Sequence, residues 1–295
     1  MQNLIQTIGR FAPSPTGALH FGSLVTAVGS YLQSKSQHGL WLVRMEDLDI
    51  PRMQYGADAK ILHTLTRFGL HWDGEIMYQQ QRQAVYKDIV QQLLAQQNAY
   101  PCGCTRNSIR QYQQKKGITS PVYPNICRQG LAQGKVARAI RVKMPAKNLV
   151  FHDSIQGKFC EHLHNDVGDF VIRRADDIIA YQLAVVVDDA DQKITQVVRG
   201  ADLLGSTSRQ IALQQLLTYP TPSYQHLPLV YNQTGQKLSK QNLAPDIGQQ
   251  PVIPTLYRVL QFLQQKPPKA LLDSDLDSFW QWAIKHWCID KIQKD

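Results

Sequence analysis

The residues of the turn His20-Phe-Gly22-Ser23 have the types and spacing of an anion-binding site. They follow a Pro- and Gly-containing turn at residues 13–17 and open a stretch with helical periodicity. The backbone N–H groups and the dipole at the start of a helix attract anions, and His20 can donate a hydrogen bond to a phosphate oxygen. Gly22 has no side chain, so a flat ring can lie against the backbone there. Taken alone, the same turn also fits a histidine on a helix face beside ordinary loop prolines.

A second segment, Lys237-Leu-Ser-Lys240, places two lysines on a predicted loop after Gly235. Lysine is a point charge that can stabilise the highly anionic transition state of phosphoryl or adenylyl transfer. An isolated segment of this kind is more often a solvated basic loop. The two segments lie about two hundred residues apart and mean more in combination than either does alone.

Three of the five cysteines lie close together in the sequence, as Cys102-Gly-Cys104 and Cys127. An odd number of cysteines, in a chain with no evident secretory signal, argues against a disulfide framework. Thiolates select Zn²⁺, and a structural zinc site has four ligands in a tetrahedron. We therefore expect a structural zinc site; the alternative is three reduced cysteines in a loop-rich insert. The residue types alone leave four candidates for the fourth ligand: His152, His162, His164 and Cys160.

The first hundred residues alternate between strand and helix patterns. Buried-strand runs at residues 7–12 and 40–45 are followed by helical periodicity at 18–33 and 57–68, and residues 81–98 form a further helix. Alternating strands and helices predict a parallel sheet with crossover helices. The anion-binding turn then lies between the first strand and the first helix.

From about residue 100 to 166 the chain is rich in Cys, Gly, Pro, Lys and Arg, which indicates an insert. Within it, residues 139–142 and 149–152 are short strand candidates. Apolar runs and periodicity predict further elements after the insert. These are strands at 170–173 and 181–187, a helix at 206–217, and an amphipathic helix at 274–287 with Ser274 as its cap.

The composition fits one large α/β domain or two ordinary ones, with 295 residues of which 43% are hydrophobic. The net charge of +9 suits a polyanionic partner such as nucleic acid, although a solvated basic surface gives the same count. The central apolar run at 183–187 is far shorter than the roughly 20 residues that span a membrane. We expect a cytoplasmic, monomeric protein with no membrane partner.

The His20 and Lys237 segments resemble the paired signatures of class I aminoacyl-tRNA synthetases. Further stretches resemble the catalytic core of glutamyl-tRNA synthetases, in order along the chain up to Lys240. These stretches begin at Arg10 (RFAPSPTG), Arg44 (RMEDLD), Asp169 (DFVIRR), Tyr181 (YQLAVVVDD) and Val198 (VRGADLL). The resemblance implies a class I α/β fold: a Rossmann-like parallel sheet with an inserted zinc-bearing α+β subdomain and a short helical C-terminal part.

Only 55 residues follow Lys240, which leaves no room for the long helical anticodon-binding region of a glutamyl-tRNA synthetase. The chain therefore resembles the short glutamyl-queuosine tRNA(Asp) synthetase family. That resemblance implies activation of L-glutamate with ATP, without a requirement for tRNA, and transfer of the glutamyl group to queuosine in the anticodon of tRNA(Asp). It also implies four parts: the first half of the catalytic domain at 1–99, the zinc-bearing insertion at 100–168, the second half at 169–235, and the Lys-Leu-Ser-Lys loop with the helical part at 236–295.

Three other functions fit parts of the sequence. A truncated glutamyl-tRNA synthetase would charge the tRNA 3′ end, but the anticodon region is missing. A zinc-bearing RNA-binding protein without catalysis would have no need of Arg10, Glu46, His20 and Lys240 together. Another nucleotidyltransferase with a similar signature is disfavoured by the stretches typical of a glutamate site. Under the favoured reading, the zinc module and the basic C-terminal part are expected to approach tRNA.

The resemblance assigns a role to each matching residue. Arg10 and Arg199 would bind the carboxylates of glutamate, since guanidiniums do so bidentately, and Glu46 would bind its α-ammonium. The implied glutamate-binding set is Arg10, Ala12, Ser14, Glu46, Tyr181 and Arg199. The implied ATP-binding set, with Mg²⁺ on the phosphates, is His20, Gly22, Ser23 and Lys240. The implied catalytic set is His20, Lys237 and Lys240. Ser23 departs from the second histidine of the signature; a serine still donates to phosphate but carries no charge.

The metal site that the resemblance implies has a different fourth ligand from the four candidates that the residue types alone allow. The family pattern of Cys-x-Cys followed by Tyr-x₃-Cys implies the ligands Cys102, Cys104, Tyr123 and Cys127. In the loop after the second strand, Asp47, Asp49 and Arg52 are expected to form an ion-pair network. Asp188 and Asp189 stay unassigned: they could contact Mg²⁺ or ribose, or they could cap the end of the strand predicted before them.

Overall fold

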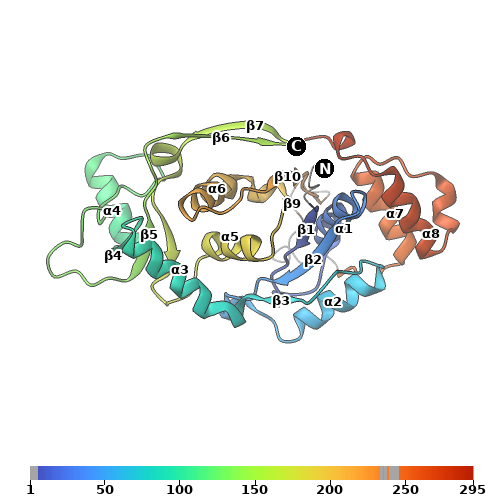
Figure 1. Ribbon diagram of the computed structural model, residues 1–295, viewed down its shortest axis with the longest axis horizontal. Coiled ribbons are helices and arrows are strands. Elements are labelled where there is room, and N and C mark those ends of the chain that lie inside the picture. Colours follow the sequence, from blue (N-terminus) through green and yellow to red (C-terminus); the bar gives the residue numbers. More distant parts are fainter. Residues whose placement is uncertain (1–5, 233–234, 236–237, 239–245, 295) are drawn as a thin grey trace.

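The computed structural model describes residues 6–232, 235, 238 and 246–294. Figure 1 shows a central α/β part, an insert at one end of the long axis and a helical C-terminal part at the other. The predicted α/β class, with a parallel sheet, an insert and a short helical C-terminal part, is confirmed. Lys237 and Lys240 lie outside the described residues.

Parallel strands form the centre of the molecule. Strand β2 (Leu40–Met45) lies between β1 (Ile8–Phe11) and the short β3 (Met77–Tyr78). A second set joins β9 (Gln196–Gly200) to β10 (Ser223–Leu227), and β10 continues to β6 (Asn148–Asp153). The backbone of Thr195 donates to the Ile8 carbonyl over 2.9 Å, so β9 runs beside β1. The carboxyl ends of β1, β2 and β9 therefore meet at one edge.

Helices cover the strands. They are α1 (Phe21–Lys35), α2 (Ala57–Arg67), α3 (Gln83–Ala95), α5 (Tyr181–Asp191) and α6 (Thr207–Leu216). Helix α1 approaches β10 closely, because a Cβ at Gly29 would lie 2.6 Å from the side chain of Leu227. A glycine at this position lets the helix that begins after His20 pack closely against the sheet.

The segment 181–187, predicted as a strand, is the first part of helix α5. Leu183 and the four residues after it are all buried. A short run that is apolar on every side has no period, so its pattern does not separate a buried strand from a buried helix. The prediction of a strand here was wrong for that reason.

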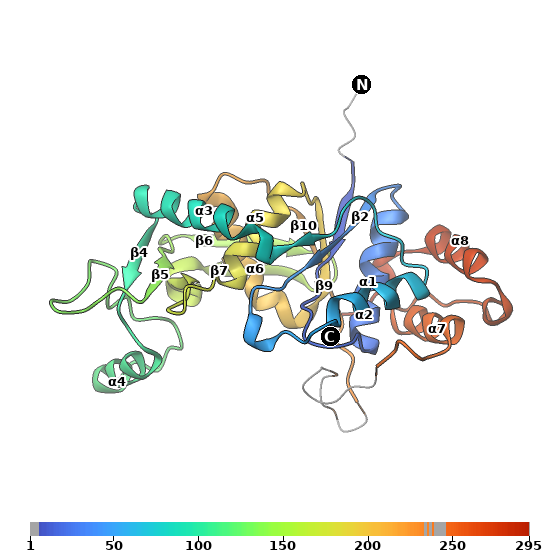
Figure 2. The same cartoon turned by 90° about the horizontal axis from the view of Figure 1, so that it is seen from below.

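The insert contains two antiparallel units and one exposed helix. Strand β5 (Ala139–Val142) pairs with β4 (Ala99–Cys102) and with β8 (Phe170–Arg173), and β6 forms a hairpin with β7 (Gly157–His162). Helix α4 (Arg106–Lys116) stands apart from these strands, as Figure 2 shows. Threonine at position 105 caps α4 through a capping box with Ser108.

The C-terminal part consists of α7 (Val252–Phe262) and α8 (Leu276–His286), which pack near α1. The Trp280 indole donates to the Phe68 carbonyl over 3.0 Å and fixes α8 against the end of α2. Asp275, rather than the predicted Ser274, caps α8, because its carboxylate accepts from the Ser278 N–H. Both residue types are good caps, and only the position of the first helical turn separates them.

The described residues also form short turns of 3₁₀ or π helix, at Ile50–Arg52, Gln79–Arg82, Leu163–Val167, Ala201–Ser206, Lys269–Asp273 and Ile289–Lys291. The buried apolar side chains form one cluster between the sheet, α1 and the C-terminal helices, another around α3, α5 and α6, and a small third one around Cys102 and Tyr123. Within the described part of the chain, no helix is long and apolar enough to cross a membrane.

Candidate active site

A pocket of about 510 Å³ lies where β1, β9 and the start of α1 meet. All six residues predicted to bind glutamate line it: Arg10, Ala12, Ser14, Glu46, Tyr181 and Arg199. Three of the four residues predicted to bind ATP line it as well: His20, Gly22 and Ser23. The structure therefore gathers residues from positions 10 to 199 into one cavity. Sequence reasoning missed several other lining residues, among them Asp202, Pro228 and Val230.

The turn at His20 has the geometry of a helix N-cap. Nδ1 of His20 accepts a hydrogen bond from the backbone N–H of Ser23 over 3.3 Å. In a neutral imidazole this places the proton on Nε2, which is then a donor. A Cβ at Gly22 would lie 3.2 Å from the His20 ring, so a side chain there would crowd the ring. The local geometry suits an anion at the start of α1.

Arg10 is held at the pocket wall by Asp189, at the end of α5. Arg10 Nε and Nη2 lie 3.0 and 3.2 Å from the two carboxylate oxygens of Asp189. Arg44 reaches the same carboxylate from β2, with Nη2 2.8 Å from Oδ1. Burial alone would raise the pKa of Asp189, but the two guanidiniums outweigh it, and the pKa is lowered. Asp189 therefore stays ionised and orients Arg10.

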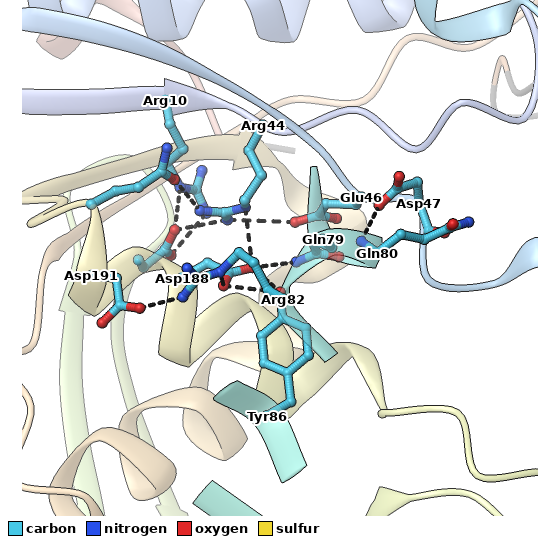
Figure 3. A network of polar contacts seen from close by, with 12 residues as sticks. Arg10, Arg44, Glu46, Asp47, Gln79, Gln80, Arg82, Tyr86, Asp188 and Asp191 are labelled. Carbon is cyan, nitrogen blue, oxygen red and sulfur yellow. Dashed lines mark hydrogen bonds and ion pairs between the residues drawn. The ribbon is translucent and has the colours of Figure 1, made fainter. Parts of the chain in front are cut away.

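Glu46 follows β2 and meets Arg44, whose side chain is fully buried (Figure 3). The distance from Arg44 Nη2 to Glu46 Oε1 is 3.5 Å, and Nη1 of Arg44 donates to Gln192 over 2.7 Å. Burial raises the pKa of Glu46 above its ordinary value, although Arg44 and Arg10 act in the opposite direction. The Glu46 carboxylate thus contacts the Arg44 guanidinium on one side and faces the pocket on the other.

Asp188 connects α5 to the segment around α3 in the same network (Figure 3). Its carboxylate accepts from Gln79 Nε2 and Arg82 Nε, each over 2.7 Å, and from the Tyr86 hydroxyl over 2.8 Å. Neither Asp188 nor Asp189 lines the pocket. Their observed contacts are to arginines and neutral donors of the chain itself, so both acids act inside the fold.

Arg199, in β9, is buried against β10 and α6. Its Nε donates to Nε2 of His226 over 2.9 Å, and Nη1 donates to Gln210 over 2.7 Å. Nη2 donates to the Thr207 hydroxyl over 3.0 Å. Nδ1 of His226 in turn lies 2.6 Å from Asp153 Oδ2. Sequence reasoning found Arg199 but not its partners, because they come from three other elements and none lies in a recognisable motif.

The loop after β2 carries part of the predicted ion-pair network. Arg52 Nη2 lies 2.7 Å from Asp49 Oδ2, and Arg174 reaches the same carboxylate over 3.5 Å. Asp47 accepts from the backbone N–H of Gln80 over 2.8 Å. The network therefore joins this loop to the chain beyond β8 and to the residues before α3.

The segment after β10 reaches the pocket at Leu238. The backbone N–H of Leu238 donates to the Val230 carbonyl over 2.8 Å, and both residues line the pocket. The structure thus brings the described part of the Lys-Leu-Ser-Lys segment next to the turn at His20, about two hundred residues away in sequence.

A second candidate site lies in the insert. The sulfur atoms of Cys102, Cys104 and Cys127 lie within 4.8 Å of one another. The Tyr123 hydroxyl is 3.4 Å from two of them, on Cys102 and Cys104. Arg141 lies over the Tyr123 ring, 3.7 Å from its centroid. Three convergent thiols suit a metal ion. Within the described residues, no His, Asp, Glu or further Cys joins this group, so none of the four generic fourth-ligand candidates does.

Comparisons with known proteins agree with this geometry. The family described as class I tRNA synthetases (E and Q), catalytic domain, matches residues 6–251. Glutamyl-Q tRNA(Asp) synthetases from Aromatoleum aromaticum and Dechloromonas aromatica are 50% and 49% identical, each over 97% of this chain and over 90% and 95% of their own lengths. The chain belongs to the glutamyl-Q tRNA(Asp) synthetase family.

Solved structures of longer relatives share the fold of this family member. A glutamate tRNA ligase from Elizabethkingia meningosepticum, in complex with its amino acid, has a TM-score of 0.81 at 24% identity. The glutamate-tRNA synthetase from Elizabethkingia anophelis has a TM-score of 0.82 at 24% identity. This chain is covered to 99% and 98% and spans 66% and 67% of those chains. The likeness confirms the fold of a class I synthetase catalytic domain.

Proposed function

We propose that this protein activates L-glutamate with ATP and transfers the glutamyl group to queuosine in the anticodon of tRNA(Asp). The observation that carries the proposal is the pocket itself, where Arg10, Arg199 and Glu46 meet the anion-binding turn at His20. Two guanidiniums and one carboxylate complement an amino acid with two carboxylates and one ammonium group. Relatives of nearly equal length carry the name of this activity.

Each lining residue has a role in this proposal. Arg10 and Arg199 bind the carboxylates of glutamate, and Glu46 accepts from its α-ammonium group. Tyr181, at the start of α5, adds a phenolic hydroxyl, and its pKa is raised by burial and by Glu46, so it stays a neutral donor. The turn after β1 adds backbone and hydroxyl groups to the lining of the pocket, at Ala12 and Ser14.

The first reaction step needs no nucleophile from the protein. The α-carboxylate of glutamate attacks the α-phosphorus of ATP, and pyrophosphate leaves with Mg²⁺ on its oxygens. His20, Ser23 and the start of α1 bind the phosphates, Gly22 accepts the nucleoside, and Lys237 and Lys240 stabilise the anionic transition state. Catalysis then consists of positioning and charge stabilisation.

The second step transfers the glutamyl group. A hydroxyl of the queuosine cyclopentenediol attacks the acyl carbon of the adenylate, and AMP leaves. The pocket opens at the edge where β1, β2 and β9 end, so an unstacked anticodon base can reach the adenylate there. ATP and tRNA are cytoplasmic molecules, and the proposal places the reaction in that compartment.

The cysteine cluster holds a structural Zn²⁺ in this proposal. Cys102, Cys104 and Cys127 supply thiolates, and the Tyr123 oxygen is the fourth ligand. Three thiolates and a tyrosine oxygen around Zn²⁺ carry net negative charge, and Arg141 beside Cys102 and Tyr123 balances it. The bound ion would fix α4 and the loop that follows it to the antiparallel sheet that contains β4.

The test is transfer of labelled glutamate to tRNA. We expect label on bulk tRNA from normal cells, none on tRNA from cells that lack queuosine, and full label on queuosine-containing tRNA whose 3′-terminal adenosine has been removed. Equal label on both tRNA pools, with loss on removing the 3′ adenosine, would instead identify a shortened charging enzyme.

A further inference from the structure

Asp153, His226 and Arg199 form a buried chain of polar contacts across three neighbouring strands. Asp153 ends β6, His226 lies in β10, and Arg199 lies in β9 directly opposite His226 in the parallel register. The side chains of Asp153 and His226 are 0% exposed. The chain begins in the insert and ends at an arginine that lines the pocket.

The hydrogen bonds determine where the proton on His226 lies. Arg199 Nε always carries a hydrogen, so Nε2 of His226, 2.9 Å away, must accept. The proton of the imidazole is therefore on Nδ1, which donates to Asp153 Oδ2 over 2.6 Å. Burial lowers the pKa of His226, and Arg199 acts in the same direction, so the ring stays neutral although Asp153 opposes the shift.

Asp153 is itself fixed by the turn after β6. Its other oxygen, Oδ1, accepts from the backbone N–H groups of Ile155 and Gln156 over 3.0 and 2.8 Å. It also accepts from the backbone N–H of His226 over 3.2 Å. Three donors on one oxygen leave the second oxygen to His226 Nδ1, so the carboxylate has one orientation.

Most of the N–H groups of Arg199 donate hydrogen bonds to other residues of the protein. Within the described residues it donates to His226, Gln210, Thr207 and the Leu203 carbonyl, which use four of the five guanidinium hydrogens. The remaining hydrogen is on Nη1, and Arg199 lines the pocket. A guanidinium held in one plane loses less entropy when it binds a carboxylate.

We propose that Asp153 and His226 are positioning residues for glutamate: Asp153 selects the tautomer of His226, and His226 holds Arg199 in the plane that binds a substrate carboxylate. This inference rests on the proposed function, in which Arg199 binds glutamate. It assigns to the insert an indirect part in amino-acid binding, because Asp153 belongs to β6 and its turn and acts through His226 and Arg199.

The substitution Asp153→Asn tests the tautomer. The asparagine Oδ1 keeps the three backbone donors, so its NH₂ group faces Nδ1 of His226. Nδ1 must then accept, the imidazole proton moves to Nε2, and two N–H groups oppose each other at Arg199. We expect the KM for glutamate in pyrophosphate exchange to rise about tenfold or more, as for loss of one charge-assisted hydrogen bond. The KM for ATP should stay unchanged.

The direct readout is ¹⁵N NMR of the histidine-labelled protein. The wild type should show His226 protonated on Nδ1, and Asp153→Asn should show it protonated on Nε2. The control is Asp73→Asn, which removes a partly exposed carboxylate that binds Lys35 and the Trp41 N–H away from the pocket. The control should keep both the wild-type tautomer and the KM for glutamate.

A second pair of variants covers the case in which Asp153→Asn does not fold. His226→Gln retains an acceptor for Arg199 and a donor for Asp153, whereas His226→Leu fills the space with neither. We expect a lower KM for glutamate in His226→Gln than in His226→Leu. Equal KM values in this pair, a wild-type proton on Nε2, or a flipped tautomer with unchanged KM would each overturn the inference. Absence of glutamate-dependent exchange in the wild type would instead overturn the proposed function.

Discussion

Single residues around the pocket show how one carboxylate can orient two cations. Asp189 binds Arg10 through both oxygens and shares one of them with Arg44. Without Asp189, the two guanidiniums would face each other in a buried space. Glu46 would then be their nearest anion, and it would be drawn away from the ammonium group that we propose it binds.

The substitution Asp189→Asn should therefore lower both stability and glutamate affinity. Breaking a buried ion pair typically costs about 3–5 kcal/mol, because an unpaired charge stays behind. Urea unfolding at pH 7 measures the loss, and Asp290→Asn, at an exposed position, is the control that should show almost none.

The pH dependence of this loss has a definite sign. The pKa of Asp189 is lowered by Arg10 and Arg44 below its ordinary 3.8, so its stabilisation is complete above that value. It disappears only as the pH falls through the lower, folded-state pKa. The difference between wild type and Asp189→Asn should stay constant from pH 8 to pH 5. A difference that shrinks across that range would contradict the assignment.

Residue identities at the pocket were predictable where they sit in ordered motifs, as Arg10, Glu46 and Arg199 do. The residues that hold them were not. His226 and Asp153 are 73 positions apart in sequence, and only the pairing of β6 with β10 brings them together. A buried histidine in a strand has no sequence signal that separates it from an ordinary core residue.

At the scale of elements, the helix α5 explains why Asp188 and Asp189 have different partners. Successive residues on a helix point about 100° apart. Asp189 therefore contacts Arg10 and Arg44, while Asp188 contacts Arg82 and Tyr86 and comes within 3.9 Å of Arg44 Nε. With this segment predicted as a strand, the two acids could not be assigned from sequence, because their directions depend on the helical backbone.

The insert offers a test of the tyrosine ligand. In Tyr123→Phe the three cysteines remain and water replaces the phenolic oxygen, so zinc should bind in the same one-to-one ratio but about tenfold or more weakly. Competition with a chromophoric chelator measures the affinity. Tyr112→Phe, on the exposed helix α4, should bind zinc as the wild type does. Equal affinity in both variants would exclude Tyr123 as a ligand.

At the scale of the whole molecule, the charge of +9 predicts an anionic partner without saying where it binds. The sequence named two candidate regions, the insert and the C-terminal part, but the C-terminal part carries nearly as many acidic residues as basic ones. Helix α4 and the C-terminal helices lie at opposite ends of the long axis (Figure 1). Every residue of α4 is at least partly exposed, and the helix carries basic residues but no acidic one. We therefore expect α4 to contact the RNA backbone.

Replacing the four basic residues of α4 by glutamine should weaken tRNA binding and leave pyrophosphate exchange intact. These residues are Arg106, Arg110, Lys115 and Lys116. The slope of log affinity against log salt is negative, and each lost phosphate contact makes it shallower by about 0.7–0.9, so four lost contacts reduce its magnitude by about three units. Filter binding across a salt series measures the slope.

The matched control removes the same charge from the other end of the molecule. In this control, glutamine replaces four of the exposed lysines at that end: Lys266, Lys269, Lys285 and Lys291. The control variant should keep a slope near that of the wild type, because α7 and α8 lie at the opposite end of the long axis from α4. A larger loss in the control than in the α4 variant would place the RNA on the C-terminal helices instead. Equal losses would mean that net charge alone sets the affinity.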